Sequence, residues 1–257
     1  RNLLCHFSGK TQEQILADRE LYASEKTCRD MEDAVRRLLN QEPLAYVLGE
    51  WDFYGMRLHI NSNVLIPRDD TCAVTALAIK QALFLEKDPR ILDLCTGSGC
   101  ILLSLLHYSL NTSGTGTDLS GEALAVAEQN AKSLGLSDRC RFIQGDLFAA
   151  LGDESELYDL LVSNPPYIRR EVIGTLETEV AQKEPYLALC GGEDGLDYYR
   201  RIFALWEPKL AVGGLFAVEI GEEQAAAVSG LMQEQGLAPS VMKDYAGHDR
   251  IVYAVKM

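Results

Sequence analysis

The sequence predicts an α/β protein built on a doubly wound, mostly parallel sheet, preceded by a small helical domain and a β-hairpin. Three observations support this prediction. From residue 91 onward, short apolar runs alternate with helical segments, which is the pattern of β-α-β units. A Gly-rich turn, "CTGSGC", follows the first of these runs, "RILDL". Before residue 90 the pattern differs, with helical spacing first and an aromatic segment after it.

The first part of the chain combines two local patterns. Residues 11–40 carry apolar side chains at helical spacing among many charges, which predicts small surface helices. In "WDFYGMRLHINSNVLIP", aromatic and β-branched residues flank Gly55 and the polar "NSN", which predicts a β-hairpin. A helix is expected to begin at Asp69, Asp70 and Thr71, whose side chains can cap its first amides. We therefore expect a helical domain over residues 1–50, a β-hairpin linker over 51–68 and the main α/β domain over 69–257.

Seven segments in the main domain are predicted to form the strands of one sheet. They are "RILDL", "GTGTDL", "CRFIQGD", "LYDLLVSN", "GGLFAVEIG", "SVMKDY" and "RIVYAVKM". Helical segments separate all but the last two, which are joined only by the short turn "AGHD". Because so short a link cannot hold a crossover helix, the last two strands are expected to pair antiparallel.

Composition and charge narrow the possible functions. The 257 residues are 47% hydrophobic and 24% charged, and no apolar run approaches the roughly 18 residues that a membrane span needs. The first residues lack the apolar core of a secretory signal, so we expect a cytoplasmic protein. The seven cysteines are scattered without the spacing of metal ligands, so no metal site is expected. A formal net charge of −14 weakens a nucleic-acid interpretation without excluding it.

The first predicted strand ends in residues suited to binding a ligand. In open α/β sheets, ligands bind beyond the carboxyl ends of the strands, near the switch in strand order. Asp93 closes the strand, and Gly97 and Gly99 permit a tight turn and a close approach of the backbone to a ligand. The third glycine of a dinucleotide fingerprint is replaced by Leu102. This favours a compact cofactor over a nicotinamide dinucleotide.

The next two strand ends are also acidic. Asp118, nineteen residues after Gly99, suits an acidic side chain that accepts hydrogen bonds from both hydroxyls of a ribose. Alternatively, it caps the helix that starts near Ser120. Asp146 is placed to accept from the exocyclic amine of a nucleobase, with Leu147 against the ring. For an isolated Asp, a capping role before "LFAAL" is equally open.

The fourth strand ends in "NPPY". Consecutive prolines fix φ and remove two backbone donors, so Asn164 to Tyr167 are expected to form a stiff lip rather than a flexible loop. Taken alone, these four residues are explained equally well by a rigid strand exit. Three acidic strand ends, one Gly-rich turn and this lip in succession favour a binding and catalytic site.

These motifs resemble those of a known group of enzymes. "DLCTGSGC", "TDLS", "GDLF" and "NPPYI" are similar to motifs of Rossmann-like, class I S-adenosylmethionine-dependent methyltransferases that act on planar nitrogens. "EPLAYVLGEWDFYG", "VLIPRDDT" and "KEPYLALCGGEDGLDYYRRI" resemble segments of the release-factor glutamine N5-methyltransferases, the PrmC/HemK family. The resemblance covers nearly the whole chain from about Glu42. Two departures are Cys95, where the family often has Gly, and "PRDDT", where it usually has Pro-Arg-Pro-Glu-Thr.

The resemblance implies a substrate, a cofactor and a set of site residues. It implies transfer of a methyl group from S-adenosyl-L-methionine to the side-chain amide nitrogen N5 of the glutamine in the Gly-Gly-Gln motif of peptide chain release factors, with S-adenosyl-L-homocysteine as the product. Release factors are then the expected partners, with no direct nucleic-acid or membrane contact. The implied catalytic residues are Asn164, Pro165, Pro166 and Tyr167. The implied cofactor-binding residues are Cys95, Thr96, Gly97, Ser98, Gly99, Asp118, Leu119, Asp146, Leu147 and Asn164.

The residue types in the lip suit this chemistry. A carboxamide nitrogen is a poor nucleophile because its lone pair is delocalised, so it needs orientation more than a strong base. The side-chain oxygen of Asn164 can accept one N–H of the substrate and the backbone carbonyl of Pro165 can accept the other. Tyr167 would pack against the flat amide. The sulfonium supplies the electrophile, so no metal or nucleophilic side chain is required.

Two other function classes remain to be weighed. The two acceptors, the Asn164 side-chain oxygen and the Pro165 carbonyl, are here called the clamp. The clamp would also serve the amino group of adenine or guanine in a nucleic acid, but the sequence shows neither a basic groove nor a target-recognition segment. A non-catalytic nucleotide-binding module would have no use for both Asn164 and Tyr167 beside its pocket. Arg68 either contacts a substrate or the cofactor carboxylate, or forms a salt bridge. The helical start and the hairpin fit recognition of a folded protein partner.

Overall fold

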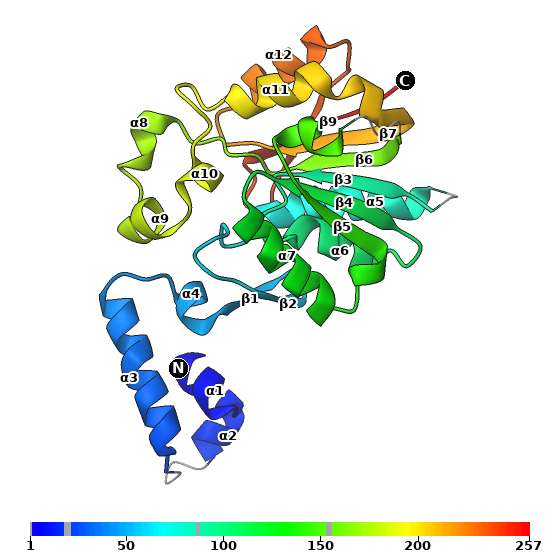
Figure 1. Ribbon diagram of the computed structural model, residues 1–257. Helices are drawn as coiled ribbons and strands as arrows, with labels where there is room; N and C mark the ends of the chain where they lie inside the picture. The colour runs from blue at the N-terminus through cyan, green and yellow to red at the C-terminus, as the bar shows by residue number, and fades with distance from the viewer. Residues whose placement is uncertain (1, 18–21, 86–87, 153–155) are drawn as a thin grey trace.

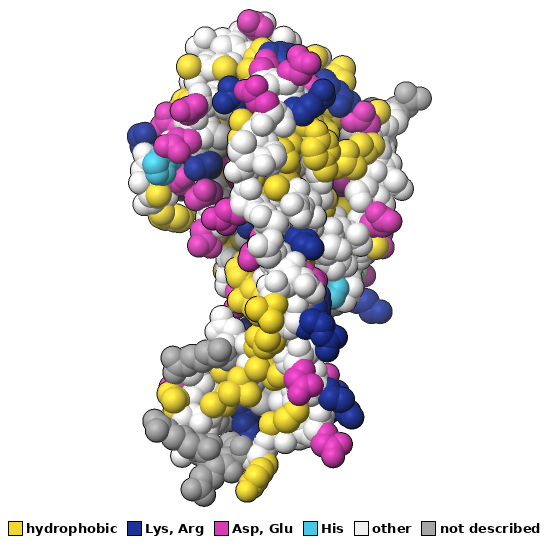
Figure 2. All heavy atoms as spheres, turned by 90° about the vertical axis from the view of Figure 1, so that its left-hand side faces the viewer, with side chains coloured by type: hydrophobic (Ala, Val, Ile, Leu, Met, Phe, Trp, Pro, Cys, Tyr) yellow, Lys and Arg dark blue, Asp and Glu magenta, His cyan; other side chains and the backbone are white. Residues whose placement is uncertain are grey.

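The computed structural model describes residues 2–17, 22–85, 88–152 and 156–257. A group of helices at the N-terminus stands apart from a larger α/β part (Figure 1). In the space-filling view, a smaller lobe joins a larger one through a narrower waist that carries hydrophobic side chains (Figure 2). The predicted fold class is confirmed. Leu21, in the predicted helical region, and residues 86–87, at the end of the helix predicted from Asp69, lie outside the described residues.

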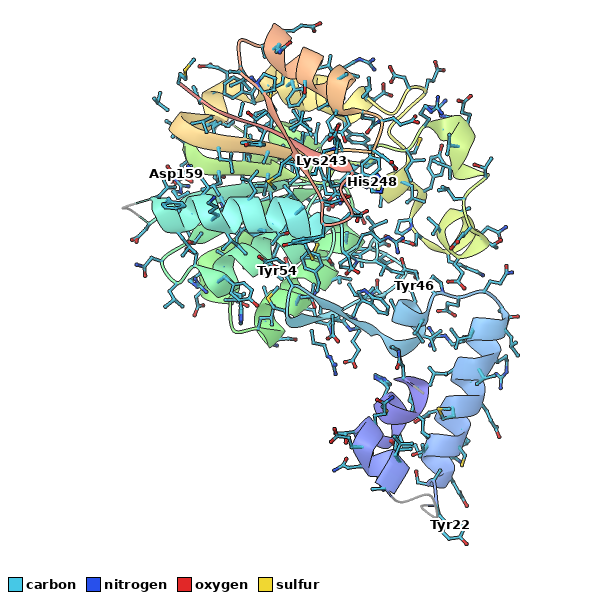
Figure 3. All side chains as sticks on the ribbon, turned by 180° about the vertical axis from the view of Figure 1, so that it is seen from behind. Tyr22, Tyr46, Tyr54, Asp159, Lys243 and His248 are labelled. Carbon is cyan, nitrogen blue, oxygen red and sulfur yellow. The ribbon has the colours of Figure 1, made fainter. Side chains whose placement is uncertain are left out.

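Among the described residues, the N-terminal region contains four helices, of which the third and longest packs against the first and the fourth. They are α1 (Asn2–Ser8), α2 (Gln12–Ala17), α3 (Glu25–Leu39) and α4 (Leu44–Leu48). The hydroxyl of Ser24 caps α3 by accepting from the amide of Thr27 at 3.0 Å. Helix α1 was not predicted, because the helical spacing was recognised only from residue 11. Figure 3 shows Tyr22 at the far end of this group and Tyr46 on α4, where the group meets the α/β part.

The predicted hairpin is confirmed and belongs to the main core. Strands β1 (Glu50–Phe53) and β2 (Met56–His59) pair antiparallel. The two turn residues, Tyr54 and Gly55, have φ values of 47° and 76°, as a two-residue hairpin turn with positive φ at both positions requires. Leu58 and Ile60 are fully buried within the hydrophobic cluster of the α/β part. The hairpin is therefore packed into the main domain rather than suspended between two domains.

The central sheet has seven strands in the order β5-β4-β3-β6-β7-β9-β8. They are β3 (Arg90–Leu94), β4 (Ser113–Asp118), β5 (Cys140–Gln144), β6 (Tyr158–Ser163), β7 (Leu210–Glu219), β8 (Ser240–Lys243) and β9 (Asp249–Val255). The first five are parallel, and β9 pairs antiparallel with both β7 and β8, as the short "AGHD" link predicts. Strands β4 and β6 lie on opposite sides of β3, so the switch in strand order falls at the carboxyl end of β3.

Helices cover both faces of the sheet (Figure 1). One face carries α5 (Thr71–Phe84), α6 (Cys100–Tyr108) and α7 (Gly121–Ser133), and the other carries α11 (Asp197–Leu205) and α12 (Ala225–Glu234). The buried apolar side chains form one cluster on each face. Shorter helices connect these layers: α8 (Arg170–Ile173), α9 (Thr178–Lys183), α10 (Tyr186–Leu189), η1 (Ser137–Arg139), η2 (Leu147–Leu151) and η3 (Glu207–Lys209). No helix among the described residues is long and apolar enough to cross a membrane.

The predicted capping of α5 is wrong. Asp70 occupies the N-cap position, but its side chain makes no capping hydrogen bond. Instead, the Asp70 carboxylate pairs with Arg250 of β9 at 3.3 Å, and the Thr71 hydroxyl accepts from Asn164 at 3.2 Å. The physical reason is tertiary. The helix begins at the carboxyl edge of the sheet, where partners from β6 and β9 compete with its own amides.

Candidate functional site

A cavity of about 300 Å³ lies at the carboxyl ends of β3, β4 and β6, within the size range of small-molecule sites. The turn after β3, the end of β4 and the lip after β6 each form part of its wall. Two segments from outside the sheet complete the wall: residues 62–67 after the hairpin, and α10. The predicted site residues that line the cavity are Cys95, Thr96, Gly97, Ser98, Asp118, Leu119, Asn164 and Pro166.

Asp118 holds the Gly-rich turn in place. One carboxylate oxygen accepts from the amide of Gly97 at 2.9 Å, and the other accepts from the amide of Ser120 at 2.9 Å. Burial raises the pKa of the Asp118 carboxyl, and these backbone hydrogen bonds oppose the rise. The alternative role of Asp118 as a helix cap does not hold, because Ser120 caps α7 by accepting from the amide of Ala123.

The turn itself requires unusual backbone angles. Gly97 and Gly99 have φ values of 54° and 79°, which glycine adopts without steric cost. Cys95 has a φ of 59°, in the left-handed region that disfavours a side chain. This explains why glycine suits the position in the family that the sequence resembles. Leu102 is fully buried and packs over Gly114 of β4.

Asp93 is a buried acid behind the turn. One oxygen accepts from the Thr96 hydroxyl at 2.7 Å, and Oδ1 has no hydrogen-bond partner among the described residues. Burial raises the pKa of its carboxyl to about 7. Ionisation of Asp93 therefore destabilises the folded protein, and the size of this destabilisation depends on pH.

The first prediction concerns this cost. The folded pKa of Asp93 is about 7 against 3.8 for an exposed Asp, so the stabilising protonated form is lost as the pH rises between these values. Asp93→Asn removes the titration. Its free energy of unfolding relative to the parent should therefore increase by about 1–3 kcal/mol from pH 5 to pH 8. Urea denaturation at both values measures this difference, and a difference that falls with pH would contradict the assignment.

Asn164 is the first residue of the lip and faces the cavity. Its side chain is half-buried and lines the cavity, and its Nδ2 donates to the Thr71 hydroxyl at 3.2 Å. Pro166 also lines the cavity, whereas Pro165 and Tyr167 are not among the residues that form its wall. The ring of Tyr167 packs against the hydrophobic cluster on the α11–α12 face, and burial strongly raises the pKa of its hydroxyl.

Two glycines brace the lip from behind. A Cβ on Gly191 would lie 2.7 Å from the Tyr167 Cα, and a Cβ on Gly195 would overlap the Tyr167 carbonyl oxygen. Gln224 donates to that same oxygen at 3.1 Å, and the amide of Ile168 donates to the Leu189 carbonyl at 2.9 Å. The lip is therefore held by tertiary contacts as well as by its two prolines.

Other predicted residues lie outside the cavity wall. Asp146 is exposed and pairs with Arg201 at 2.6 Å, and Leu147 is buried with a φ of 51°. Gly99 faces Leu103 and α7. A nucleobase-binding role for Asp146 and Leu147 stays a prediction. Arg68 forms a salt bridge with Glu184, which is the second of the two roles considered for it.

Sequence reasoning did not single out some residues of the site individually. They are Tyr198, which lines the cavity from α11, and Tyr186 and Leu187 of α10. Glu219 is not among the residues that form the cavity wall, but it ends β7 beside the lip and is only 1% exposed. The signal for Glu219 was present as an acid at the end of an apolar strand, in "FAVEIG". Within the described residues, no group of three or more His, Cys, Asp or Glu side chains is placed to hold a metal ion.

Comparisons with known proteins identify the class first. Residues 85–194 match a family model described as a methyltransferase domain, and residues 1–49 match one described as the PrmC N-terminal domain. The crystal structure of a methyltransferase from Pyrococcus furiosus has a similar fold, with a TM-score of 0.59 and 16% identity over 88% of this chain and 98% of that chain. The fold is that of Rossmann-like methyltransferases, and part of the chain matches a methyltransferase domain.

The family follows from two relatives. The release factor glutamine methyltransferase of Clostridium acetobutylicum is 36% identical over 99% of this chain and 89% of its own length. That of Caulobacter vibrioides is 41% identical over 97% of this chain and 86% of its own length. The chain belongs to the release factor glutamine methyltransferase family. The predicted family and enzyme class are confirmed, and the nucleic-acid alternative is not favoured.

Proposed function

We propose that this protein transfers a methyl group from S-adenosyl-L-methionine to N5 of the glutamine in the Gly-Gly-Gln motif of peptide chain release factors. The observation that carries the proposal is the position of Asn164, on a braced lip beside a cavity bounded by the Gly-rich turn and Asp118. The names of the relatives support the glutamine of a release factor as the substrate.

The residues of the cavity fit the cofactor. Asp118 would accept hydrogen bonds from the ribose hydroxyls, and the turn from Cys95 to Gly99 would approach the methionine moiety closely. Asp118 and Glu122 give the wall a negative charge, which suits a cationic ligand. When bound, S-adenosyl-L-methionine supplies an electrophilic methyl group on a positively charged sulfur.

The lip would orient the substrate nitrogen. Since Nδ2 of Asn164 donates to Thr71, its Oδ1 is left to accept one N–H of the glutamine amide. The backbone carbonyl of Pro165 would accept the second. Both acceptors stabilise positive charge that develops on the nitrogen during transfer, and the braced backbone keeps them aligned. Chemistry of this kind depends on the precision of the lip rather than on a strong base.

A second prediction tests the ribose site. Asp118→Ala should weaken cofactor binding by about 1–3 kcal/mol, because it removes acceptors for the ribose and the carboxylate that holds the Gly97 amide. Cofactor titration by calorimetry measures the change. Asp138→Ala, at an exposed position on η1, is the control and should bind like the parent. Parental affinity in Asp118→Ala would show that the ribose site is misassigned.

The division of labour within the chain is part of the proposal. Residues 1–50 dock the release factor, and residues 69–257 carry most of the methyltransferase site. The segment over 51–68 joins the two parts, and its residues 62–67 contribute to the wall of the cavity. The separate lobe formed by α1–α3 and the match of residues 1–49 to an N-terminal domain model support this division. A stable complex of two folded proteins generally buries about 1,000 Å² or more, which calls for a surface beyond the cavity.

The substrate class is tested by transfer of labelled methyl from S-adenosyl-L-methionine. A purified release factor, duplex DNA and RNA are offered in parallel at matched concentrations. We expect label in the release factor and background counts in both nucleic acids. Label in DNA or RNA with none in the release factor would replace this proposal with the nucleic-acid amino-group alternative.

A further inference from the structure

Glu219 is a buried acid that the proposed mechanism does not use. It ends β7, beside the lip, because Ser163 of β6 pairs with Val218 of β7 and the next residues on the two strands are Asn164 and Glu219. Its side chain is 1% exposed, and Oε2 has no hydrogen-bond partner among the described residues. Burial of a carboxyl group in this position destabilises the fold unless neighbouring groups form hydrogen bonds or ion pairs with it.

Thr71 closes a triangle with these two residues. It is the first residue of α5, 2% exposed, and its hydroxyl accepts from Nδ2 of Asn164 at 3.2 Å. The Thr71 hydroxyl and the Asn164 carboxamide both lower the pKa of the Glu219 carboxyl, so both groups lie close enough to stabilise its charge. Burial acts in the opposite direction and is the larger effect, so the pKa of Glu219 is raised to about 7.

Donor and acceptor rules give this triangle a direction. An ionised carboxylate only accepts, so the Thr71 hydroxyl can bind Glu219 only as the donor, with its single proton. The hydroxyl oxygen must then accept from its other neighbour, Asn164. An amide can donate only through its nitrogen, so Nδ2 turns toward Thr71 and Glu219 and Oδ1 turns toward the cavity that Asn164 lines.

We propose that Glu219 and Thr71 are positioning residues that fix which end of the Asn164 carboxamide faces the cavity. The inference rests on the proposed function of Asn164 as the acceptor for the substrate amide. The two ends of a carboxamide have nearly the same shape, so packing alone does not choose between them. A reversed Asn164 would present N–H groups to the N–H groups of the substrate, and the clamp would repel the nitrogen it should hold.

The series of contacts from Glu219 through Thr71 to Asn164, here called the relay, makes the rate of methyl transfer depend on pH. A protonated Glu219 can donate to Thr71, which removes the constraint on the direction of the triangle. The charged and titratable groups coupled electrostatically to Glu219 are Arg250 of β9, Asp70 and Cys72 at α5, Tyr167 of the lip, Tyr199 of α11 and Cys100 of α6. Among the groups that act on its pKa, Arg250 lowers it and Asp70 raises it. With a pKa of about 7, kcat/KM for the cofactor should fall as the pH decreases below neutrality.

The test compares five variants of the full chain, Asn164→Ala among them, in single-turnover methylation of a release factor. Thr71→Val and Glu219→Gln should each slow transfer about tenfold or more, with cofactor affinity within about twofold of the parent. Thr71→Ser keeps the hydroxyl and should recover most of the rate lost in Thr71→Val. The control is Thr75→Val, one turn along α5, where an equally buried hydroxyl donates only to the Thr71 carbonyl.

The pH profile separates positioning from a merely structural role. The decrease of kcat/KM below pH 7 should be present in Thr75→Val and absent in Glu219→Gln. If Thr71→Val transfers methyl as fast as Thr75→Val while Asn164→Ala is slow, the relay is wrong and the clamp stands. A parental rate in Asn164→Ala would overturn the clamp and the relay together.

Discussion

Asn164→Ala should slow methyl transfer to a release factor by a factor of about one hundred or more, the scale of a lost oxyanion-type contact. The structure gives the reason. The amide nitrogen of Asn164 is committed to Thr71, so its oxygen is the end available to the substrate. Removing that oxygen removes both an aiming contact and an acceptor that strengthens as the nitrogen gains positive charge.

The loss should appear in the chemical step. Cofactor affinity should change much less, because Asn164 is one of many residues that form the cavity wall, together with the Gly-rich turn, Asp118 and α10. Rapid-quench single-turnover assays separate the rate of transfer from binding, and Asn111→Ala, at an exposed position, is the matched control. Transfer at the parental rate in Asn164→Ala would reduce the lip to a rigid strand exit.

Removal of residues 1–41 should abolish methylation of the release factor while cofactor binding is preserved. The cut falls between α3 and α4 for a structural reason. Tyr46 of α4 donates its hydroxyl to the Val64 carbonyl at 2.6 Å, and Leu58 of β2 is fully buried in the main core. A cut after α4 would expose that core to solvent. The cut after residue 41 removes only α1–α3, which form the separate lobe (Figure 1).

The expected result has two measured parts. The cofactor dissociation constant of the shortened chain should lie within about twofold of the parent, and kcat/KM for the release factor should fall at least about a hundredfold, on the scale of lost interface contacts. Calorimetry and labelled-methyl transfer measure the two. Full turnover of the release factor by the shortened chain would show that α1–α3 do not dock the substrate.

The sequence predicted the fold through local signals. The alternation after residue 91, the hairpin around Gly55 and the short "AGHD" link are each set by neighbours in the chain, and the structure agrees with all three. Capping of α5 was predicted wrongly because the decisive partners, Arg250 and Asn164, are far away in sequence. Local capping rules cannot include such competitors.

The residues of the site were likewise predictable only where a local sequence pattern marked them. Strand-end residues such as Asp118 and Asn164 were identified because the carboxyl ends of parallel strands share one edge of a sheet. Residues 62–67 join that edge only through tertiary packing, which no local pattern encodes. Glu219 was overlooked because its significance depends on its electrostatic coupling to Thr71, which is far away in sequence.

The most direct test of the proposed function locates the transferred methyl group. A release factor and its variant with Ala in place of the Gly-Gly-Gln glutamine are incubated with the protein and S-adenosyl-L-methionine, then digested and sequenced by tandem mass spectrometry. We predict one methyl group on the side-chain nitrogen of that glutamine and none anywhere in the Ala variant. Equal methylation of both proteins would contradict the proposal that the braced Asn164 lip orients this glutamine amide for transfer.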